Sequence, residues 1–166
     1  MDPIPEFGIK RENEERRDGG CAVVLDPASG LYAVGERTDD GMLILFSGGV
    51  DEGEDMHEGI LREVREESGL HDFGTTEKIA EALTHYYNRA KGVNRCAQAT
   101  CLLIVLNSTA SVAPTLEAHE RFSLVWRTPE EILENWKLHN HDQGLDHWMY
   151  FLTRGVARAR ELGVAP

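Results

Sequence analysis

Three glutamates between residues 62 and 68 have the type and spacing needed to hold a divalent cation. In a helix, Glu63 and Glu67 lie one turn apart and Glu66 lies beside them, so all three carboxylates project from one side. Like charges this close repel one another and raise the pKa values of the group. Mg²⁺ prefers carboxylate oxygens and fills its remaining positions with waters and substrate phosphates. The spacing therefore predicts a cation site that also attracts a phosphate-bearing ligand.

The residues around these glutamates could support such a site. Residues 51–67 contain eight acidic residues and only two arginines, so the segment needs compensating positive charge. We expect Arg62 to hold the carboxylate of Glu54 through its bidentate guanidinium fork. Gly48 and its glycine neighbours would let the loop backbone approach a ligand or an ion closely. The sequence thus predicts a glycine-rich loop followed by a helix that stops at Gly69.

The arrangement resembles the Nudix box, in which a glycine, five residues, a glutamate and seven residues precede an Arg-Glu-aliphatic-x-Glu-Glu-x-Gly-aliphatic run. Every fixed position of that motif has its counterpart here: Gly48, Glu54, Arg62, Glu63, Val64, Glu66, Glu67, Gly69 and Leu70. Seven fixed identities would coincide by chance on the order of once in 10⁸ trials at background frequencies. Phe46 and Ser47 stand where many members have an aliphatic residue and proline, a difference that removes no ligand. The sequence is therefore similar to the Nudix hydrolase family.

The resemblance implies a fold, a reaction and a cofactor. The fold would be α+β, with a mixed β-sheet sandwiched between α-helices. The reaction would be the Mg²⁺- or Mn²⁺-dependent hydrolysis of a pyrophosphate bond in a nucleoside diphosphate linked to another group, X. The partner would be a nucleotide substrate. A nucleotide-binding module that does not cleave its ligand is the alternative, although the complete box favours the enzyme.

The resemblance also implies roles for single residues. Glu63 and Glu67 would be the principal metal ligands, and Glu66 a further ligand. The carbonyl of Ser47 or Gly48 would complete a coordination shell. The pair Arg62 and Glu54 would orient the site, and Gly69 would have a structural role.

Family members often add a metal ligand or a base from a loop outside the box. Here Glu120 is the first candidate, because its position relative to Trp126 resembles the family's. Glu117 and His119 are alternatives in the same loop. A plain surface acid is the other interpretation of Glu120.

Five residues are candidates for substrate contact: Arg37, Tyr86, Tyr87, Arg89 and Arg95. Arg37 ends the strand before the box strand, where Nudix proteins often keep an arginine near the substrate; a surface ion pair is the alternative. Arg89 and Arg95 belong to a basic loop that could hold distal phosphates or be a solvated hairpin turn. The two tyrosines follow the box at a spacing that hints at dinucleoside polyphosphates, but tyrosine is also common in strands.

Hydrophobic patterns predict the elements that must position these residues. We expect strands at 21–25, 31–37, 42–46, 79–87, 95–106 and 121–127, which are rich in β-branched and aromatic residues. Thr128 and Glu131 have the spacing of a capping box, so a short helix should begin there. Apolar residues recur at helical spacing over 144–161 and predict a last helix packed on the sheet.

Length and composition bound the remaining possibilities. The 166 residues fit one domain, which we place at 20–166, after residues 1–19, which resemble a cloning scar followed by a charged arm. The net charge of −12 argues against general nucleic-acid binding. No apolar run is long enough to cross a membrane. An odd number of cysteines without a CxxC motif favours free thiols and a cytoplasmic location. The sequence leaves the oligomeric state open, a homodimer included.

Overall fold

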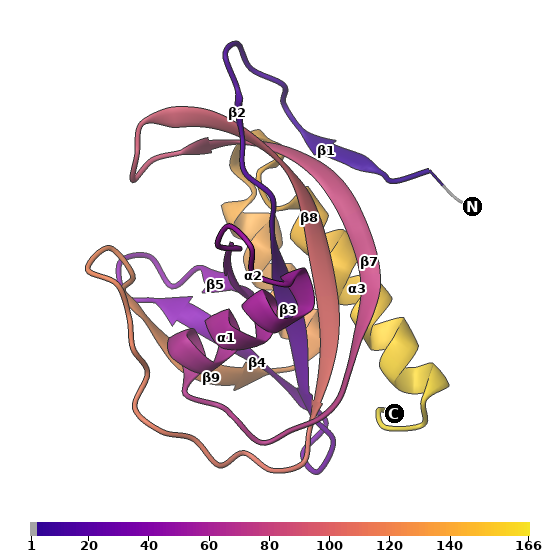
Figure 1. The fold of residues 1–166 in the computed structure, drawn as a ribbon. Coiled ribbons are helices and arrows are strands. Elements are labelled where there is room, and N and C mark those ends of the chain that lie inside the picture. Colours follow the sequence, from indigo (N-terminus) through magenta and orange to yellow (C-terminus); the bar gives the residue numbers. More distant parts are fainter. Residues whose placement is uncertain (1–2) are drawn as a thin grey trace.

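The computed structural model describes residues 3–166, which form one mixed nine-stranded sheet with helices on both faces (Figure 1). The strands are β1 (Glu6–Gly8), β2 (Glu15–Arg16), β3 (Gly19–Asp26), β4 (Leu31–Arg37), β5 (Leu43–Ile44), β6 (Phe46–Gly49), β7 (Phe73–Asn88), β8 (Val93–Leu106) and β9 (Phe122–Arg127). The helices are α1 (Met56–Ser68), α2 (Pro129–His139), the short 3₁₀ helix η1 (His141–Gln143) and α3 (Asp146–Glu161). The fold class predicted from the sequence is confirmed.

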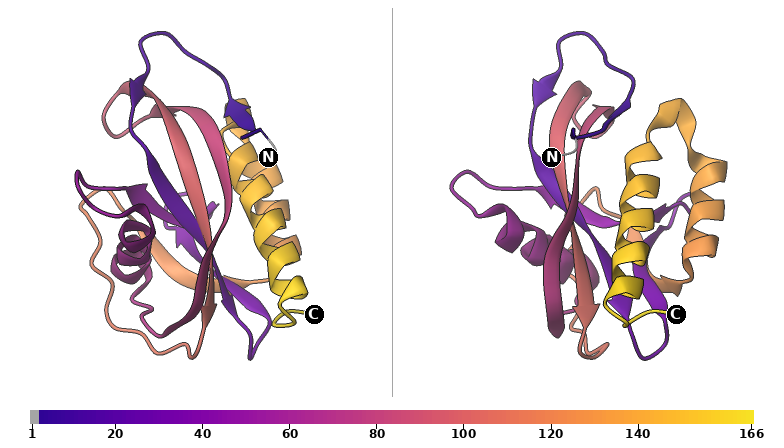
Figure 2. Two further views of the ribbon diagram at one scale, coloured as in Figure 1. Left: turned by 45° about the vertical axis from the view of Figure 1, so that its right-hand side comes forward. Right: turned by 90° about the vertical axis from the view of Figure 1, so that its right-hand side faces the viewer.

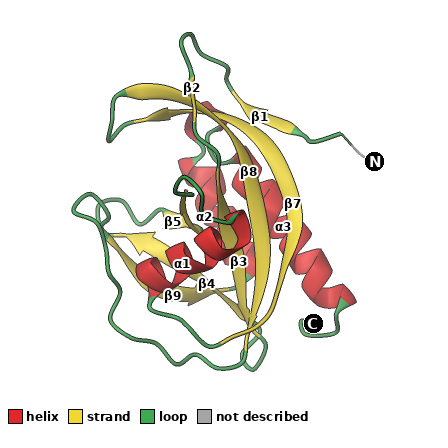
Figure 3. Ribbon diagram, viewed as in Figure 1, coloured by secondary structure: helices red, strands yellow, loops and turns green. Residues whose placement is uncertain are grey.

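Strand β3 lies at the centre of the sheet and determines where the sheet splits. It runs parallel to β8 along one edge. Along the other edge, its first half pairs with β6 and its second half pairs with β4, both antiparallel. The long hairpin of β7 and β8 extends beyond this centre (Figure 3). The end of β6 is therefore separated from β4 and β9, and the segment that follows β6 leads into α1.

Two apolar cores lie on opposite faces of the sheet. Figure 2 shows the helices that cover these two faces. Helix α1 covers one face through Ile60, Leu61 and Val64, which pack with even-numbered residues of β8 such as Leu102. Helices α2 and α3 cover the other face, where odd-numbered residues of β8 belong to the core. The alternation of side chains along a strand explains this division, because successive residues point to opposite faces.

The ends of α1 and α2 follow from local sequence. Asp55 caps α1 by accepting a hydrogen bond from the backbone of Glu58, and Gly69 ends the helix with a φ of 80°. A side chain at Gly69 would also overlap the carbonyl of Val112. At α2, Thr128 forms the predicted capping box. These local predictions are confirmed.

Two predicted regions differ from the structure. The single strand expected at 42–46 is divided into β5, which pairs with β4, and β6, which pairs with β3, because the chain crosses between two neighbours of the sheet. The charged arm expected outside the domain contributes β1 and β2, which run parallel to β7 and β8. His85 of β7 helps hold this arm through hydrogen bonds to Glu6 and Glu14. An open strand edge is a ready partner for an added strand.

In residues 3–166, no helix is both long and apolar enough for a membrane crossing.

Candidate active site

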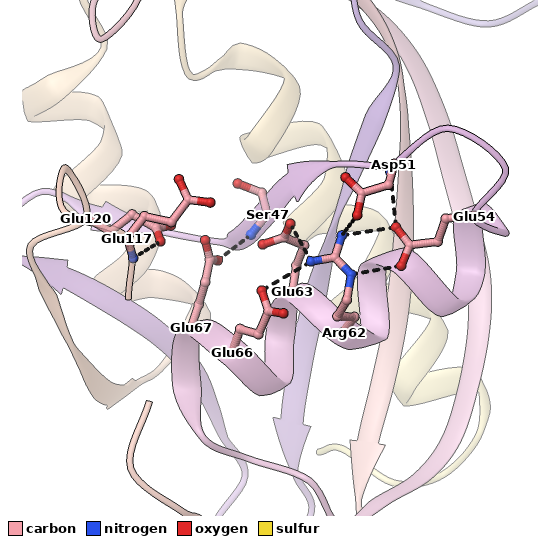
Figure 4. A network of polar contacts seen from close by, with 9 residues as sticks. All are labelled: Ser47, Asp51, Glu54, Arg62, Glu63, Glu66, Glu67, Glu117 and Glu120. Carbon is pink, nitrogen blue, oxygen red and sulfur yellow. Dashed lines mark hydrogen bonds and ion pairs between the residues drawn. The ribbon is translucent and has the colours of Figure 1, made fainter. Parts of the chain in front are cut away.

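Helix α1 holds two of its glutamates against β6 (Figure 4). Glu67 is only 5% exposed and accepts a hydrogen bond of 2.8 Å from the backbone N–H of Ser47. The Glu63 carboxylate lies so close to Gly48 that a Cβ atom at this position would overlap it. The glycine expected to allow close approach is therefore needed for a carboxylate of the protein itself. Both acids lie at the edge of the apolar core beside Val64, as the helical spacing predicted.

Arg62 is the centre of an ionic network along α1. Its Nε and Nη2 atoms bind the two oxygens of Glu54 at 2.8 and 3.0 Å. Its Nη1 atom donates to Glu63 at 3.2 Å and to Glu66 at 3.1 Å. Hydrogen bonding to Arg62 lowers the pKa of Glu54, and hydrogen bonding to Glu54 raises the pKa of Arg62. The arginine therefore stays charged and holds three carboxylates in place.

Glu120 reaches this cluster from the loop before β9. Burial and the hydrogen-bonded Glu120 carboxyl together raise the pKa of Glu67 to about 10, and burial is the larger cause. Burial likewise raises the pKa of Glu63 to about 7, with the charges of Glu66 and Glu120 adding to the effect. Carboxylates that repel in a poorly solvated place take up protons unless a cation compensates them. The cluster thus favours the binding of positive charge.

The loop itself distinguishes Glu120 from its neighbours. The backbone N–H of Glu117 donates to the Glu120 carboxylate at 2.8 Å, and the N–H of Glu120 donates to the Glu117 carbonyl at 2.9 Å. The Glu117 side chain is 75% exposed and lies near His119. Of the three polar candidates in this loop, Glu120 is the one that the structure brings to the box glutamates.

The donor atoms suit a hard cation, because they are carboxylate oxygens. Within residues 3–166, however, no three acidic, histidine or cysteine side chains are already arranged around one point. The reason is visible in the network: Arg62 binds Glu63 and Glu66, while Glu67 lies with Glu120. Binding of a cation at Glu63 or Glu66 would therefore have to compete with Arg62 for carboxylate oxygens.

Strand pairing directs the two candidate ligand carbonyls, those of Ser47 and Gly48, to different sides of β6. Ser47 directs its N–H away from β3 to Glu67, so its carbonyl also points away from β3. Gly48 is paired with Gly20 and its carbonyl oxygen lies against Gly19, inside the sheet. The Ser47 carbonyl is therefore the one on the side of Glu67. The ligand role predicted for Gly48 does not fit this pairing.

Four of the five predicted substrate contacts lie away from the glutamate cluster, whereas Arg37 is level with Phe122, two residues from Glu120. Arg37 ends β4 and makes an ion pair with Asp40 at 3.4 Å, which is the structural alternative considered for it. The other four candidates lie on the β7–β8 hairpin, close to its turn: Tyr86, Tyr87, Arg89 and Arg95. In this hairpin Asn88, the last residue of β7, pairs with Val93, the first residue of β8. Thr100 is the β8 residue level with Gly48, so these four residues lie several positions farther along the hairpin. Their role in substrate contact stays a prediction.

One residue near the box escaped the sequence analysis. The guanidinium of Arg17 occupies the space that a Cβ atom of Gly49 would need. Arg17 belongs to the charged arm, which offers no periodic or motif signal, so the sequence alone could not find it. The second glycine of the pair at 48–49 was the one available hint.

Comparisons with known proteins agree with this site. A family model described as NUDIX domain matches residues 15–149. No curated protein matches the chain. Among solved structures, the chain is similar to an Ap4A hydrolase from C. elegans, with 17% identity over 87% of this chain and 98% of that chain and a TM-score of 0.63.

Two further structures resemble the chain. A NUDIX hydrolase from Nitrosomonas europaea has 17% identity over 84% of this chain and 91% of that chain, with a TM-score of 0.54. The E. coli ORF135 protein has 20% identity over 92% and 96%, with a TM-score of 0.55. Identities this low establish the shared fold alone. The family model spans most of the chain and includes the whole box, and the chain accordingly belongs to the NUDIX family of hydrolases, which act on phosphoric anhydrides.

Proposed function

We propose that the protein is a Mg²⁺-dependent pyrophosphohydrolase that cleaves a nucleoside diphosphate linked to another group. The observation that carries this proposal is the cluster of Glu63, Glu67 and Glu120 beside the Arg62 network. Carboxylates with raised pKa values next to a fixed arginine are typical of a functional site rather than of a solvated helix surface. A non-catalytic binding module would not need every acid of the box.

The residues of the candidate active site would make distinct contributions to this reaction. Divalent cations, when bound, would neutralise phosphate oxygens and lower the pKa of a bound water. Glu63 and Glu67 would hold them, with Glu66 and the Ser47 carbonyl as further ligands. Arg62 would keep Glu63 and Glu66 oriented, because Glu54 anchors its other side.

Glu120 would act as a ligand or as the base that takes a proton from the attacking water. Its carboxylate already lies beside Glu67, and its backbone is fixed by the Glu117 carbonyl. An acid at this place matches the requirement that a base lie within hydrogen-bonding reach of its proton. Mn²⁺ would serve as well as Mg²⁺, since both prefer oxygen ligands.

The X group is the open part of the proposal. The C. elegans neighbour is named for Ap4A, a dinucleoside polyphosphate. Tyr87 is half exposed at the end of the hairpin, where its ring could stack on a base. Dinucleoside polyphosphates therefore come first among the substrates to screen, with nucleoside triphosphates and nucleotide sugars beside them.

The test is a substrate panel with Mg²⁺, in which phosphate is measured with and without added phosphatase. The Glu63→Gln variant keeps the shape of the side chain but removes the charge of a ligand. We expect its kcat to fall by roughly 10³-fold or more. Glu58→Gln is the matched control, because Glu58 is exposed in the first turn of the same helix. Wild-type turnover in folded Glu63→Gln at saturating Mg²⁺ would refute the assignment, and nucleotide binding without turnover would favour the binding module.

We also propose a cytoplasmic location. Cys21, Cys96 and Cys101 are free thiols, and the first and last of them are buried in the sheet. Free buried cysteines are usual in a reducing compartment.

A further inference from the structure

The N-terminal arm crosses the β7–β8 hairpin from one strand to the other. Strand β1 runs along β7, and β2 runs along β8, so residues 9–14 pass over the hairpin between them (Figure 1). Asn94 of β8 fastens this crossing by donating a hydrogen bond of 2.9 Å to the Glu12 carbonyl. We call residues 6–16 the strap.

The strap is fitted to the domain at its first strand. The Phe7 ring lies against Tyr150 of α3, with 5.4 Å between the ring centroids. Gly8 has a φ of 87°, and a Cβ atom there would overlap the carbonyl of His85. Beyond its last strand the chain continues into β3, which pairs with β6. The position of the strap is therefore coupled to the strand beside the box loop.

His85 lies beneath the strap with a carboxylate at each ring nitrogen. Its side chain is only 5% exposed. Its Nδ1 atom lies 2.9 Å from both oxygens of Glu14, and its Nε2 atom lies 2.6 Å from Oε1 of Glu6. The Glu14 side chain is 7% exposed and that of Glu6 is 57% exposed. One of the two contacts is therefore buried and the other reaches solvent.

The two contacts together need two hydrogens. A neutral imidazole has one N–H and an imidazolium has two, whereas an ionised carboxylate has none. Burial raises the pKa of Glu14, but hydrogen bonds from the Arg11 backbone and from His85, with the charge of Lys10, outweigh burial and hold that pKa below its ordinary value. Exposed carboxyl groups such as that of Glu6 ionise well below neutral pH. The closed strap therefore requires the imidazolium form of His85.

Other charges around the imidazole oppose its protonation. A cavity of about 540 Å³ lies between the strap and the hairpin, and His85 and both glutamates line it. The other titratable side chains that line this cavity are Lys10, Arg11, Arg16 and Cys96. Two of these cations are engaged elsewhere, because Arg11 donates to the Ile9 carbonyl and Arg16 donates to Asp18. Nearby positive charge and burial both favour release of the imidazole proton, so two carboxylates stand against two opposing effects.

We propose that the strap is a pH-dependent closure of the hairpin, held shut by the imidazolium of His85 between Glu14 and Glu6. Closure takes up a proton, so the closed strap is favoured at low pH and is lost as the pH rises through the range in which histidine changes charge, roughly pH 5 to 8. Once the proton leaves, one carboxylate faces a nitrogen lone pair, and a buried carboxylate without a donor is costly. The inference does not depend on the proposed function, because no residue of the strap belongs to the candidate active site.

The test measures how well the strap is protected from trypsin, which cleaves after lysine and arginine, here Lys10, Arg11 and Arg16. The full chain is digested at pH 6 and at pH 8, and mass spectrometry identifies the cleavage sites. Each rate is divided by that of a free peptide with the sequence of residues 8–18, which corrects for the pH dependence of trypsin. We expect protection of the wild type to fall about tenfold between the two pH values, because uptake of one proton changes an equilibrium by at most about tenfold per pH unit.

The variant Glu14→Gln supplies the missing hydrogen. Its amide can donate to Nδ1 of a neutral imidazole, whose Nε2–H then donates to Glu6, and its carbonyl can still accept from the Arg11 backbone. We expect this variant to stay protected at pH 8, with a change of less than about twofold between the two pH values. Glu12→Gln is the matched control, because Glu12 is exposed on the same strap, and it should keep the pH dependence of the wild type.

Nitrogen NMR of the His85 ring identifies the group that titrates. In the wild type, the signals of the imidazolium should give way to those of the neutral ring over the pH range in which protection falls. Equal protection of the wild type at pH 6 and pH 8, or a fall in protection while the His85 ring keeps one protonation state, would overturn the proposal. A Glu14→Gln variant that keeps the wild-type pH dependence, or that is unprotected at both pH values, would overturn it as well.

Discussion

The substitution Glu67→Gln should stabilise the metal-free protein while destroying its metal site. Glu67 is almost fully buried, and its pKa is raised from 4.5 to about 10. A raised pKa means that the folded state holds a proton that the unfolded state releases. The associated stability is complete below pH 4.5 and is lost as the pH rises toward 10. At pH 8 the loss is at most about 5 kcal/mol, at about 1.4 kcal/mol per pH unit.

Glutamine avoids this loss and keeps the local contacts. Its carbonyl oxygen can still accept from the Ser47 N–H, and its amide can donate to the Glu120 carboxylate. Water penetration reduces the full electrostatic effect, so we expect a gain of about 2–3 kcal/mol at pH 8. For a domain of this size the gain corresponds to a rise of roughly 5–10 °C in melting temperature.

Thermal unfolding in EDTA between pH 6.5 and 8.5 checks this reasoning. The difference between Glu67→Gln and wild type should grow with pH. His147, whose pKa burial lowers to about 4, is present in both proteins, so its contribution to stability cancels in this difference. Millimolar Mg²⁺ should raise the melting temperature of the wild type but not that of the variant. A variant that melts at or below the wild-type temperature in EDTA at pH 8, with Glu58→Gln unchanged, would refute the argument.

The remaining predictions concern the loop acid and a helix end. Glu120→Gln should lower kcat with little change in KM, and by less than Glu63→Gln does. Glu117→Gln should leave kcat near the wild-type value, because the Glu117 side chain is exposed. Steady-state kinetics of the two variants, measured in parallel, test this difference, and a large loss of kcat in Glu117→Gln would contradict the assignment of Glu120. Gly69→Ala should cost roughly 2–3 kcal/mol of unfolding free energy, since it adds a left-handed φ and an overlap with the Val112 carbonyl. Gly53→Ala has the same φ in open space and should cost only about 1 kcal/mol in denaturant unfolding, so equal losses would contradict the role of the overlap.

Local interactions explain what could be predicted from the sequence. Helix α1 and its stop at Gly69 depend on residues within a few positions of each other, as does the capping box at Thr128. The pairing of Arg62 with Glu54 spans eight residues of one loop and helix, and the structure contains it. The spacing of the box residues therefore predicts both helix α1 and the chemistry of its glutamates.

Only tertiary pairing decided the rest. Glu120 reaches Glu67 because β9 pairs with β4, far from the box in sequence. Which of the two carbonyls, that of Ser47 or that of Gly48, lies on the side of Glu67 depends on which β6 residues bond to β3. A shift of the pairing by one residue would reverse the two directions.

The N-terminal arm shows the same dependence most clearly. A run of charged residues has no periodicity that predicts a strand, and its pairing with β7 and β8 follows from the open edges that the folded sheet presents. That pairing places Arg17 beside Gly49 and brings Glu14 to His85. The sequence by itself determined the family, the box helix and its acids, because these depend on short-range spacing. The tertiary structure decided which distant charges meet them, because such contacts depend on strand register between segments far apart in the chain.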